Sequence, residues 1–281
     1  MKATILCLYN DGAKERTSLI GDHGQSLLID VDGERVLFDT GAKGAVLLNN
    51  MDALGIDAES IDRIILSHGH YDHTWGLPDL LSRRSSPVEV IAHPVAVEPK
   101  VRALGGLRYQ RIGFPRIPEE LQERMVLRLS AAPVQVTEHL STTGEISEND
   151  EKRNIVSRIQ RRIGGEWTTD DLVDDLSLVL RTSEGSVLIC GCCHAGILNT
   201  LAQVRKLHQS DVHAVLGGIH MLSSSVEDVD RVIEVLESEY GSPILWLNHC
   251  TGENTISSLR EHFSMERVRS LLVGEGMEFP L

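Results

Sequence analysis

Four potential metal ligands stand within six positions of one short segment of the chain. The segment reads Ser67-His68-Gly69-His70-Tyr71-Asp72-His73 and directly follows the apolar run Ile64-Ile65-Leu66. Neutral imidazoles and a carboxylate suit zinc, with iron and manganese as alternatives. His68 and His70 alternate, so both rings face the same side of an extended loop, whereas Asp72 and His73 come as the chain turns. The spacing therefore predicts a metal site in which one segment serves two ions.

Three further histidines lie just past apolar runs that read as strands. His194 follows residues 187–190, His220 follows residues 212–216, and His249 follows residues 244–247. A single histidine in such a place is more often structural. The recurrence at several strand ends favours a common metal centre, because functional residues concentrate on loops that a rigid scaffold holds.

The order of the expected elements predicts how these loops are held. Strand-like runs at 4–8, 26–30 and 35–39 indicate a meander, followed by a helix at 46–54 and strands at 63–66 and 88–93. The last third reads as a hairpin at 176–190, helices at 197–207, 226–240 and 255–263, and strands at 212–216 and 244–247. We therefore expect an α/β protein, a four-layer αββα sandwich of two mixed sheets with outer helices.

Two inserts, at about 98–128 and 145–171, interrupt the expected pattern. The first carries a local surplus of Lys and Arg with Gly105-Gly106, which fits either a mobile lid over a site or a solvated insert. The second is expected to contain a surface helix at about 155–163. Without a linker or an internal repeat, we expect residues 1–281 to form a single domain.

The composition of the chain limits the classes of partner that it is expected to bind. The chain has 281 residues, 41% hydrophobic, with a formal net charge of -14, which argues against nucleic acid or an anionic membrane as partner. One small, possibly phosphorylated substrate remains open, because divalent ions reverse the local charge of a pocket. No run approaches the ~20 apolar residues of a membrane span, and the five cysteines look like reduced thiols. We expect a cytoplasmic protein; its oligomeric state stays open.

The motifs resemble the metallo-β-lactamase superfamily. Leu37-Phe38-Asp39-Thr40-Gly41 and the His-x-His-x-Asp-His segment followed by Gly76-Leu77 carry this resemblance. Later segments resemble its dihydropterin-ribofuranosylaminobenzene-phosphate synthase-like subfamily: Asp174-Asp175-Leu176-Ser177-Leu178, Gly191-Cys192-Cys193-His194-Ala195-Gly196-Ile197, Gly217-Gly218-Ile219-His220 and Asn248-His249-Cys250-Thr251-Gly252. The resemblance covers nearly the whole chain and implies a dinuclear metal centre.

The resemblance also assigns roles. It makes His68 and His70 ligands of the first metal, and Asp72 and His73 ligands of the second, which His249 completes. It makes Asp39 a carboxylate that orients the ligand loop by hydrogen bonding.

Two positions depart from the superfamily pattern. The histidine expected before the hairpin has no clean match, since a long insert follows His139; His194 is the better candidate to complete the first site. Cys192 stands where an aspartate commonly bridges the two metals, and both a thiolate ligand and a buried neutral thiol remain open there.

Three functions are compatible with these residues. The first is a hydrolase whose metal-activated water attacks a phosphoryl or acyl centre, with Asp72 and His220 as catalytic residues; His220 is also a candidate substrate contact or ligand. The second is a transferase that condenses a dihydropterin diphosphate with a ribofuranosylaminobenzene phosphate, with cationic residues such as Arg108 holding phosphates. The third is a non-catalytic ligand-sensing or di-iron redox protein. Trp75 is expected to wall the substrate pocket.

Overall fold

Two mixed sheets face one another at the centre of the molecule. The computed structural model describes residues 1–105, 108–148 and 151–281. The first sheet has seven strands in the order β17-β1-β2-β3-β4-β5-β8, and the second has six in the order β16-β15-β14-β13-β12-β9. The first consists of β1 (Lys2–Tyr9), β2 (Ser26–Val31), β3 (Glu34–Phe38), β4 (Arg63–Ile65), β5 (Val88–Ala92), β8 (Met125–Leu129) and β17 (Gly276–Pro280). The second consists of β9 (Leu140–Thr142), β12 (Leu178–Thr182), β13 (Gly185–Cys190), β14 (Val212–Gly217), β15 (Ile244–Leu247) and β16 (Val268–Ser270).

Side chains that alternate between the two faces of each strand form the core between the sheets. In β2, Leu27 and Ile29 face the second sheet, whereas Leu28 faces the opposite side, as the two-residue period of a strand requires. Residues of β12 and β13, such as Leu180 and Ile189, complete the same apolar cluster from the other sheet. Two inner faces of this kind pack into one core layer.

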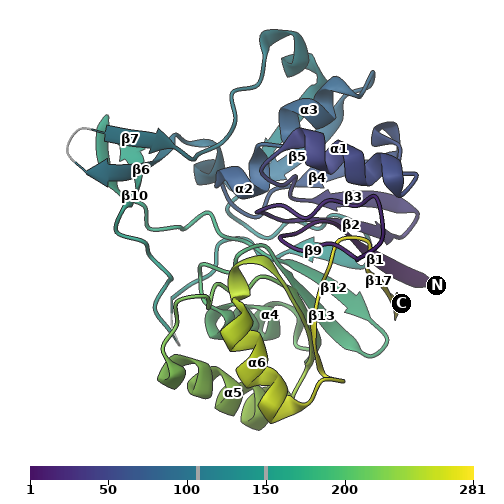
Figure 1. Cartoon of the computed structure of the whole chain (residues 1–281), viewed down its shortest axis with the longest axis vertical. Coiled ribbons are helices and arrows are strands. Elements are labelled where there is room, and N and C mark those ends of the chain that lie inside the picture. Colours follow the sequence, from purple (N-terminus) through teal and green to yellow (C-terminus); the bar gives the residue numbers. More distant parts are fainter. Residues whose placement is uncertain (106–107, 149–150) are drawn as a thin grey trace.

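Helices cover the two outer faces, as Figure 1 shows. α1 (Gly44–Ala53) and α3 (Leu77–Ser82) pack on the first sheet, and α4 (Ile197–His208), α5 (Val226–Tyr240) and α6 (Glu253–Phe263) pack on the second. The predicted αββα sandwich is therefore confirmed. In the part of the chain that the structure describes, no helix is long and apolar enough to cross a bilayer.

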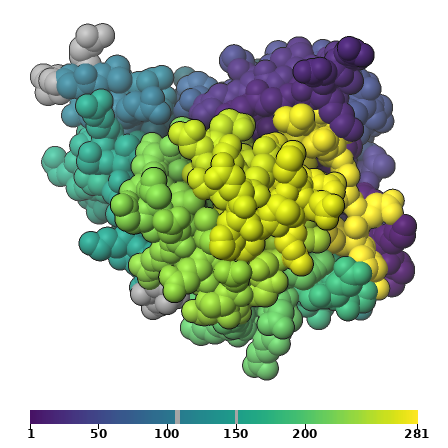
Figure 2. Space-filling model, turned by 60° about the horizontal axis from the view of Figure 1, so that its bottom comes forward, coloured from purple at the N-terminus to yellow at the C-terminus, as the bar shows by residue number. Residues whose placement is uncertain are grey.

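The two ends of the chain meet in the first sheet. β17 pairs antiparallel with β1, with Lys2 opposite Pro280. Figure 2 shows C-terminal residues, in yellow, bordering N-terminal residues, in purple. The C-terminal third thus supplies most of the second sheet and returns to close the edge of the first.

The two inserts pair with each other. β6 (Lys100–Gly105), β7 (Arg108–Arg111), β10 (Ile159–Ile163) and β11 (Glu166–Thr169) form a small antiparallel sheet in the order β11-β10-β6-β7, which extends to one side of the sandwich in Figure 1. The helix expected at 155–163 is therefore wrong. Gly164 and Gly165 both have positive φ and turn the chain into a hairpin, and β6 offers β10 a pairing partner. The first insert, for which the sequence left a lid or a solvated segment open, contributes β6 and β7 to this sheet, and its last residues form β8, which pairs with β5.

Candidate metal centre

The predicted ligands come from strand ends of both sheets. His68 and His70 follow β4, and α2 (Tyr71–Thr74) carries Asp72 and His73. His194, His220 and His249 follow β13, β14 and β15, which are adjacent and parallel. Because carboxyl ends of parallel strands meet at one edge, the loops converge there.

The first predicted group is compact. His68 Nε2 lies 3.0 Å from His70 Nδ1, and the His194 ring lies 4.8 Å from the His68 ring and 5.1 Å from the His70 ring, between centroids. Ligand atoms of His68, His194 and Cys192 lie within 4.8 Å of one another. Cys192 Sγ therefore belongs to this group.

The second predicted group shares that sulfur. His73 Nε2 lies 3.1 Å from Cys192 Sγ, and His249 Nε2 lies 3.4 Å from Asp72 Oδ2. Ligand atoms of His73, Cys192 and His249 again lie within 4.8 Å of one another. The structure thus brings all six predicted ligands together, and Cys192 belongs to both groups.

The protonation states of three histidines in the cluster suit metal binding. Burial lowers the pKa of His68 and the pKa of His194 well below the ordinary value of a histidine. Burial, and to a smaller extent the positive charge of Lys100, lower the pKa of His70 to about 4. These imidazoles are therefore neutral at pH 7, the form that binds metals. Burial also lowers the pKa of His249, but hydrogen bonds to Asp11 and Asp72 outweigh it and hold the value well above ordinary. The proton that these carboxylates stabilise on His249 occupies a position that a metal cation could take instead.

Unpartnered polar atoms give a second test of fit. Both ring nitrogens of His194 and Oδ1 of Asp72 are buried without a hydrogen-bond partner among the described residues. Buried polar groups are normally satisfied, and nitrogen and oxygen donors at such spacing would be satisfied by a divalent ion. The donor set therefore fits the metal that the sequence predicts.

Asp39 orients the ligand loop. Its carboxylate accepts hydrogen bonds from Ser67 N at 2.7 Å and from Ser67 Oγ at 2.8 Å, and its Oδ2 lies 2.7 Å from His73 Nδ1. Asp39 is fully buried and has a positive φ of 63°. A Cβ on Gly191 would lie 2.2 Å from Ser67 Oγ, so a glycine is needed beside this network. Asp39 therefore contacts both the start of the predicted ligand loop and the ring of His73.

A buried ion-pair network ties the inserts to the same loop. Lys100 Nζ lies 2.6 Å from Asp170 Oδ2 and 2.8 Å from Asp174 Oδ1, and all three side chains are fully buried. Asp174 Oδ2 also accepts a hydrogen bond from Gly69 N, between His68 and His70, at 2.8 Å. The sequence analysis missed this network, because its members are far apart in the chain.

Asp11 and His23 were also missed. Asp11 Oδ1 lies 2.9 Å from His249 Nδ1, and His23 Nε2 lies 3.2 Å from Asp72 Oδ2. Hydrogen bonds to Asp11 and Asp72 raise the pKa of His23 to about 9. The search for histidines just past apolar strands, here called the strand-end rule, could have found Asp11 if it had included carboxylates, because Asp11 stands just past β1. His23 precedes a strand and gave no such signal.

The other residues considered from the sequence are His220, Trp75, Arg108 and His139. His220 lies in the cluster, with its ring 4.2 Å from that of His194. Trp75 donates its indole N–H to Gly113 O at 2.8 Å and is not among the residues that line the cavity described next. The side chain of Arg108 lies outside the described part of the structure. His139 pairs with Asp32, at 2.7 Å between Nδ1 and Oδ1, in a group separate from the cluster.

A cavity of about 560 Å³ opens over the cluster. Its floor includes His70, Asp72, Cys192, His194 and His249, and both inserts contribute to its walls. The insert residues are Arg102, Ile112, Asn154, Ile155, Val156 and Ile159. The first insert therefore lines the cavity with one cation, Arg102, and one apolar side chain, Ile112, and the second insert supplies the other apolar side chains.

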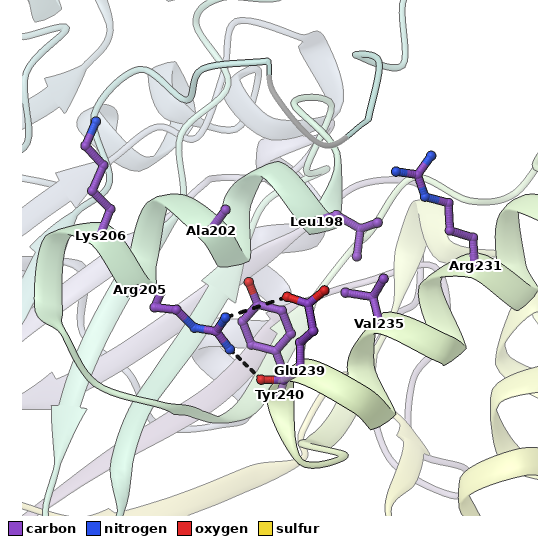
Figure 3. Close-up of a pocket in the computed structure, with 8 residues that line it drawn as sticks. All are labelled: Leu198, Ala202, Arg205, Lys206, Arg231, Val235, Glu239 and Tyr240. Carbon is purple, nitrogen blue, oxygen red and sulfur yellow. Dashed lines mark hydrogen bonds and ion pairs between the residues drawn. The ribbon is translucent and has the colours of Figure 1, made fainter.

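A different groove, of about 380 Å³, lies between α4 and α5. Figure 3 shows Arg205 of α4 reaching Glu239 and Tyr240 of α5. The Arg205 guanidinium lies 4.0 Å from the centroid of the Tyr240 ring. The described residues that line this groove include no histidine or cysteine, so the candidate chemistry lies in the cavity over the cluster.

Comparison with known proteins agrees with this architecture. The chain is 31% identical to the 7,8-dihydropterin-6-methyl-4-(beta-D-ribofuranosyl)-aminobenzene-5'-phosphate synthase of Methanocaldococcus jannaschii, over 98% of this chain and 96% of that protein. The structure of Tm1679, a metal-dependent hydrolase of the beta-lactamase superfamily, superposes with a TM-score of 0.84 at 27% identity, covering 99% of this chain and 100% of that one. YhfI from Bacillus subtilis, a metallo-beta-lactamase fold protein, shares the fold at a TM-score of 0.60 and 13% identity, over 99% of each chain. The metallo-beta-lactamase superfamily model matches residues 19–195, and the chain belongs to this superfamily.

Proposed function

We propose that this chain is a metal-dependent hydrolase that acts on a small phosphorylated or ester-type metabolite. The observation that carries the proposal is the cavity that opens onto the cluster of imidazoles, carboxylate and thiol. Bound divalent ions would lower the pKa of a water molecule and polarise the scissile phosphoryl or acyl group. The net charge of -14 supports a small substrate rather than nucleic acid.

The protein residues have distinct roles in this proposal. His68, His70 and His194 would hold one ion, and Asp72, His73 and His249 the other, with Zn²⁺ the best match to the ligands and Fe or Mn as alternatives. Asp39 fixes the His73 ring so that its Nε2 faces the cluster.

His220 and Arg102 would act on the substrate. His220 lines the cavity, and its Nδ1 has no hydrogen-bond partner among the described residues. It would therefore transfer a proton to the leaving group or contact the substrate. Arg102, on the wall that the first insert forms, would pair with a phosphate.

A second candidate is a transferase. It is supported by the similarity to the Methanocaldococcus jannaschii synthase over nearly the full length of both chains. The apolar wall formed by Ile112, Ile155 and Val156 would suit flat ring systems, such as the pterin and aminobenzene of that protein's product. The same residues would then hold ions that stabilise the departing diphosphate, while an amine instead of water attacks the carbon that carries it.

The metal dependence is tested with His70→Ala. The variant should lose turnover together with the ion that His68, His70 and His194 would hold, whereas His139→Ala, which alters a histidine outside the cluster, should keep both. Metal content is measured on protein purified without added metal. Turnover is then screened on phosphodiesters, thioesters, lactones and pterin diphosphates. Retained turnover in demonstrably metal-free protein would refute the proposal.

The two reactions are distinguished by acceptor dependence. Diphosphate release from a dihydropterin diphosphate is measured with and without the ribofuranosylaminobenzene phosphate. A hydrolase releases diphosphate at the same rate in both cases, whereas a transferase requires the amine.

A further inference from the structure

Two sulfurs and one imidazole form a third possible ligand set in the cluster. Ligand atoms of Cys192, His220 and Cys250 lie within 4.8 Å of one another. The residues follow β13, β14 and β15, three neighbouring parallel strands. Two members, His220 and Cys250, lie outside the two groups described above, and Cys192 is shared with both.

The surroundings hold the set together and leave one of its ligand atoms, His220 Nδ1, without a hydrogen-bond partner among the described residues. Cys192 and Cys250 are 3% and 8% exposed, and Cys250 Sγ donates to Cys192 O at 3.5 Å. A Cβ on Gly218 would lie 2.5 Å from Cys250 Sγ, so glycine at this position leaves the space that the sulfur occupies.

We propose that Cys192, His220 and Cys250 form an additional metal site for a thiophilic divalent ion, of which Zn²⁺ is the biological example. Sulfur and imidazole are the ligands that such ions prefer. In a tetrahedral site with Zn–S bonds of about 2.3 Å, two sulfurs are about 3.8 Å apart, which is compatible with the 4.8 Å limit found here.

All three residues line the cavity. The fourth position of the ion would therefore face the space into which a substrate enters, as in sites that keep one position open. On binding, each thiol releases one proton to solvent and forms one sulfur–metal bond, so the two thiolates balance the charge of the divalent ion. The site goes beyond the proposed function and does not depend on hydrolytic activity. While it holds an ion, His220 is a ligand and is not the proton donor or substrate contact described above.

Cobalt substitution tests this site in the full-length protein. Co²⁺ bound by thiolate has a charge-transfer absorption in the near ultraviolet, which a site of imidazoles and carboxylates lacks. The wild type should show this absorption, and Cys192→Ser and Cys250→Ser should each lose at least half of it. Cys193→Ser is the matched control, because this neighbouring buried thiol contacts Thr200 Oγ1 at 3.3 Å and lies outside the set. Unchanged absorption in Cys250→Ser, or no absorption in the Co²⁺-loaded wild type, would overturn the proposal.

A second measurement avoids the variants at the thiols. In wild-type protein, Cd²⁺ should protect Cys250 from alkylation by iodoacetamide, as read by peptide mass spectrometry, since a metal-bound thiolate is a poor nucleophile. Equal alkylation with and without Cd²⁺ would refute the assignment. The cobalt absorption should also persist in His70→Ala, whose loss of turnover tests the proposed function, so the two proposals can fail separately.

Discussion

Replacing Asp39 with asparagine should weaken metal binding although Asp39 is not a predicted ligand. The carboxylate serves three polar groups: Ser67 N, Ser67 Oγ and His73 Nδ1. An asparagine offers one acceptor oxygen and an NH₂ group that would face a donor, so the His73 ring loses the partner that fixes its orientation. Loss of such a partner lowers metal affinity by about 10- to 100-fold, or about 1.4–2.7 kcal/mol.

The chain offers a matched control in Asp32→Asn. Asp32 serves Thr137 Oγ1, His139 N and His139 Nδ1, the last at 2.7 Å, so its environment resembles that of Asp39. Both variants should lower the free energy of unfolding of the metal-free protein by about 1–3 kcal/mol. Asp39→Asn alone should lower Zn²⁺ affinity, measured by competition with a chromophoric chelator. Equal Zn²⁺ affinities in Asp39→Asn and the wild type would refute the role given to this carboxylate.

Three other perturbations test the buried charges and the metal. Lys100→Met should lower the free energy of unfolding by about 3–5 kcal/mol in urea, because Asp170 and Asp174 lose their cation; adding Asp170→Asn should recover part of the loss, and a change below about 1 kcal/mol would contradict the network. Burial raises the pKa of Asp175 to about 7, so the folded state keeps a proton that the unfolded state loses above about pH 4, and stability falls as pH rises from about 4 to 7. The free energy of unfolding of Asp175→Asn minus that of the wild type should therefore be larger at pH 8 than at pH 4, by at most about 4 kcal/mol. It is measured by urea unfolding of metal-free protein, and a difference that does not change with pH would rule this out. Chelation at neutral pH should lower the melting temperature and added Zn²⁺ should restore it; an unchanged melting temperature would argue against a metal that binds the folded state.

Local signals explain which elements could be predicted. α5 spans residues 226–240 as expected, because its apolar residues follow the helical period, Ser225 and Asp228 form a capping box, and Gly241 ends it in a left-handed conformation. β10 was mistaken for a helix because Ile155, Ile159 and Ile163 share the helical spacing. Its strand conformation depends on pairing with β6, which is far away in the sequence. No local pattern carries that information.

The same distinction holds for the candidate site. The strand-end rule located the histidines that converge, because each follows its own apolar run and the fold brings strand ends together. It could not locate Lys100, which lies inside the first insert and meets Asp170 and Asp174 only after the inserts pair. The spacing between Cys192 and Cys250 also arises from the adjacency of β13, β14 and β15.

The paired inserts have a consequence for chimeric proteins. Because β6 and β10 belong to one small sheet, and because Lys100 from the first insert neutralises Asp170 from the second insert and Asp174 just after it, neither segment is an independent module. A graft of one insert from a relative would leave an unmatched strand edge and a buried charge without its partner. Exchange of substrate preference between relatives therefore requires both segments to be transplanted together, as a single cassette with two points of attachment.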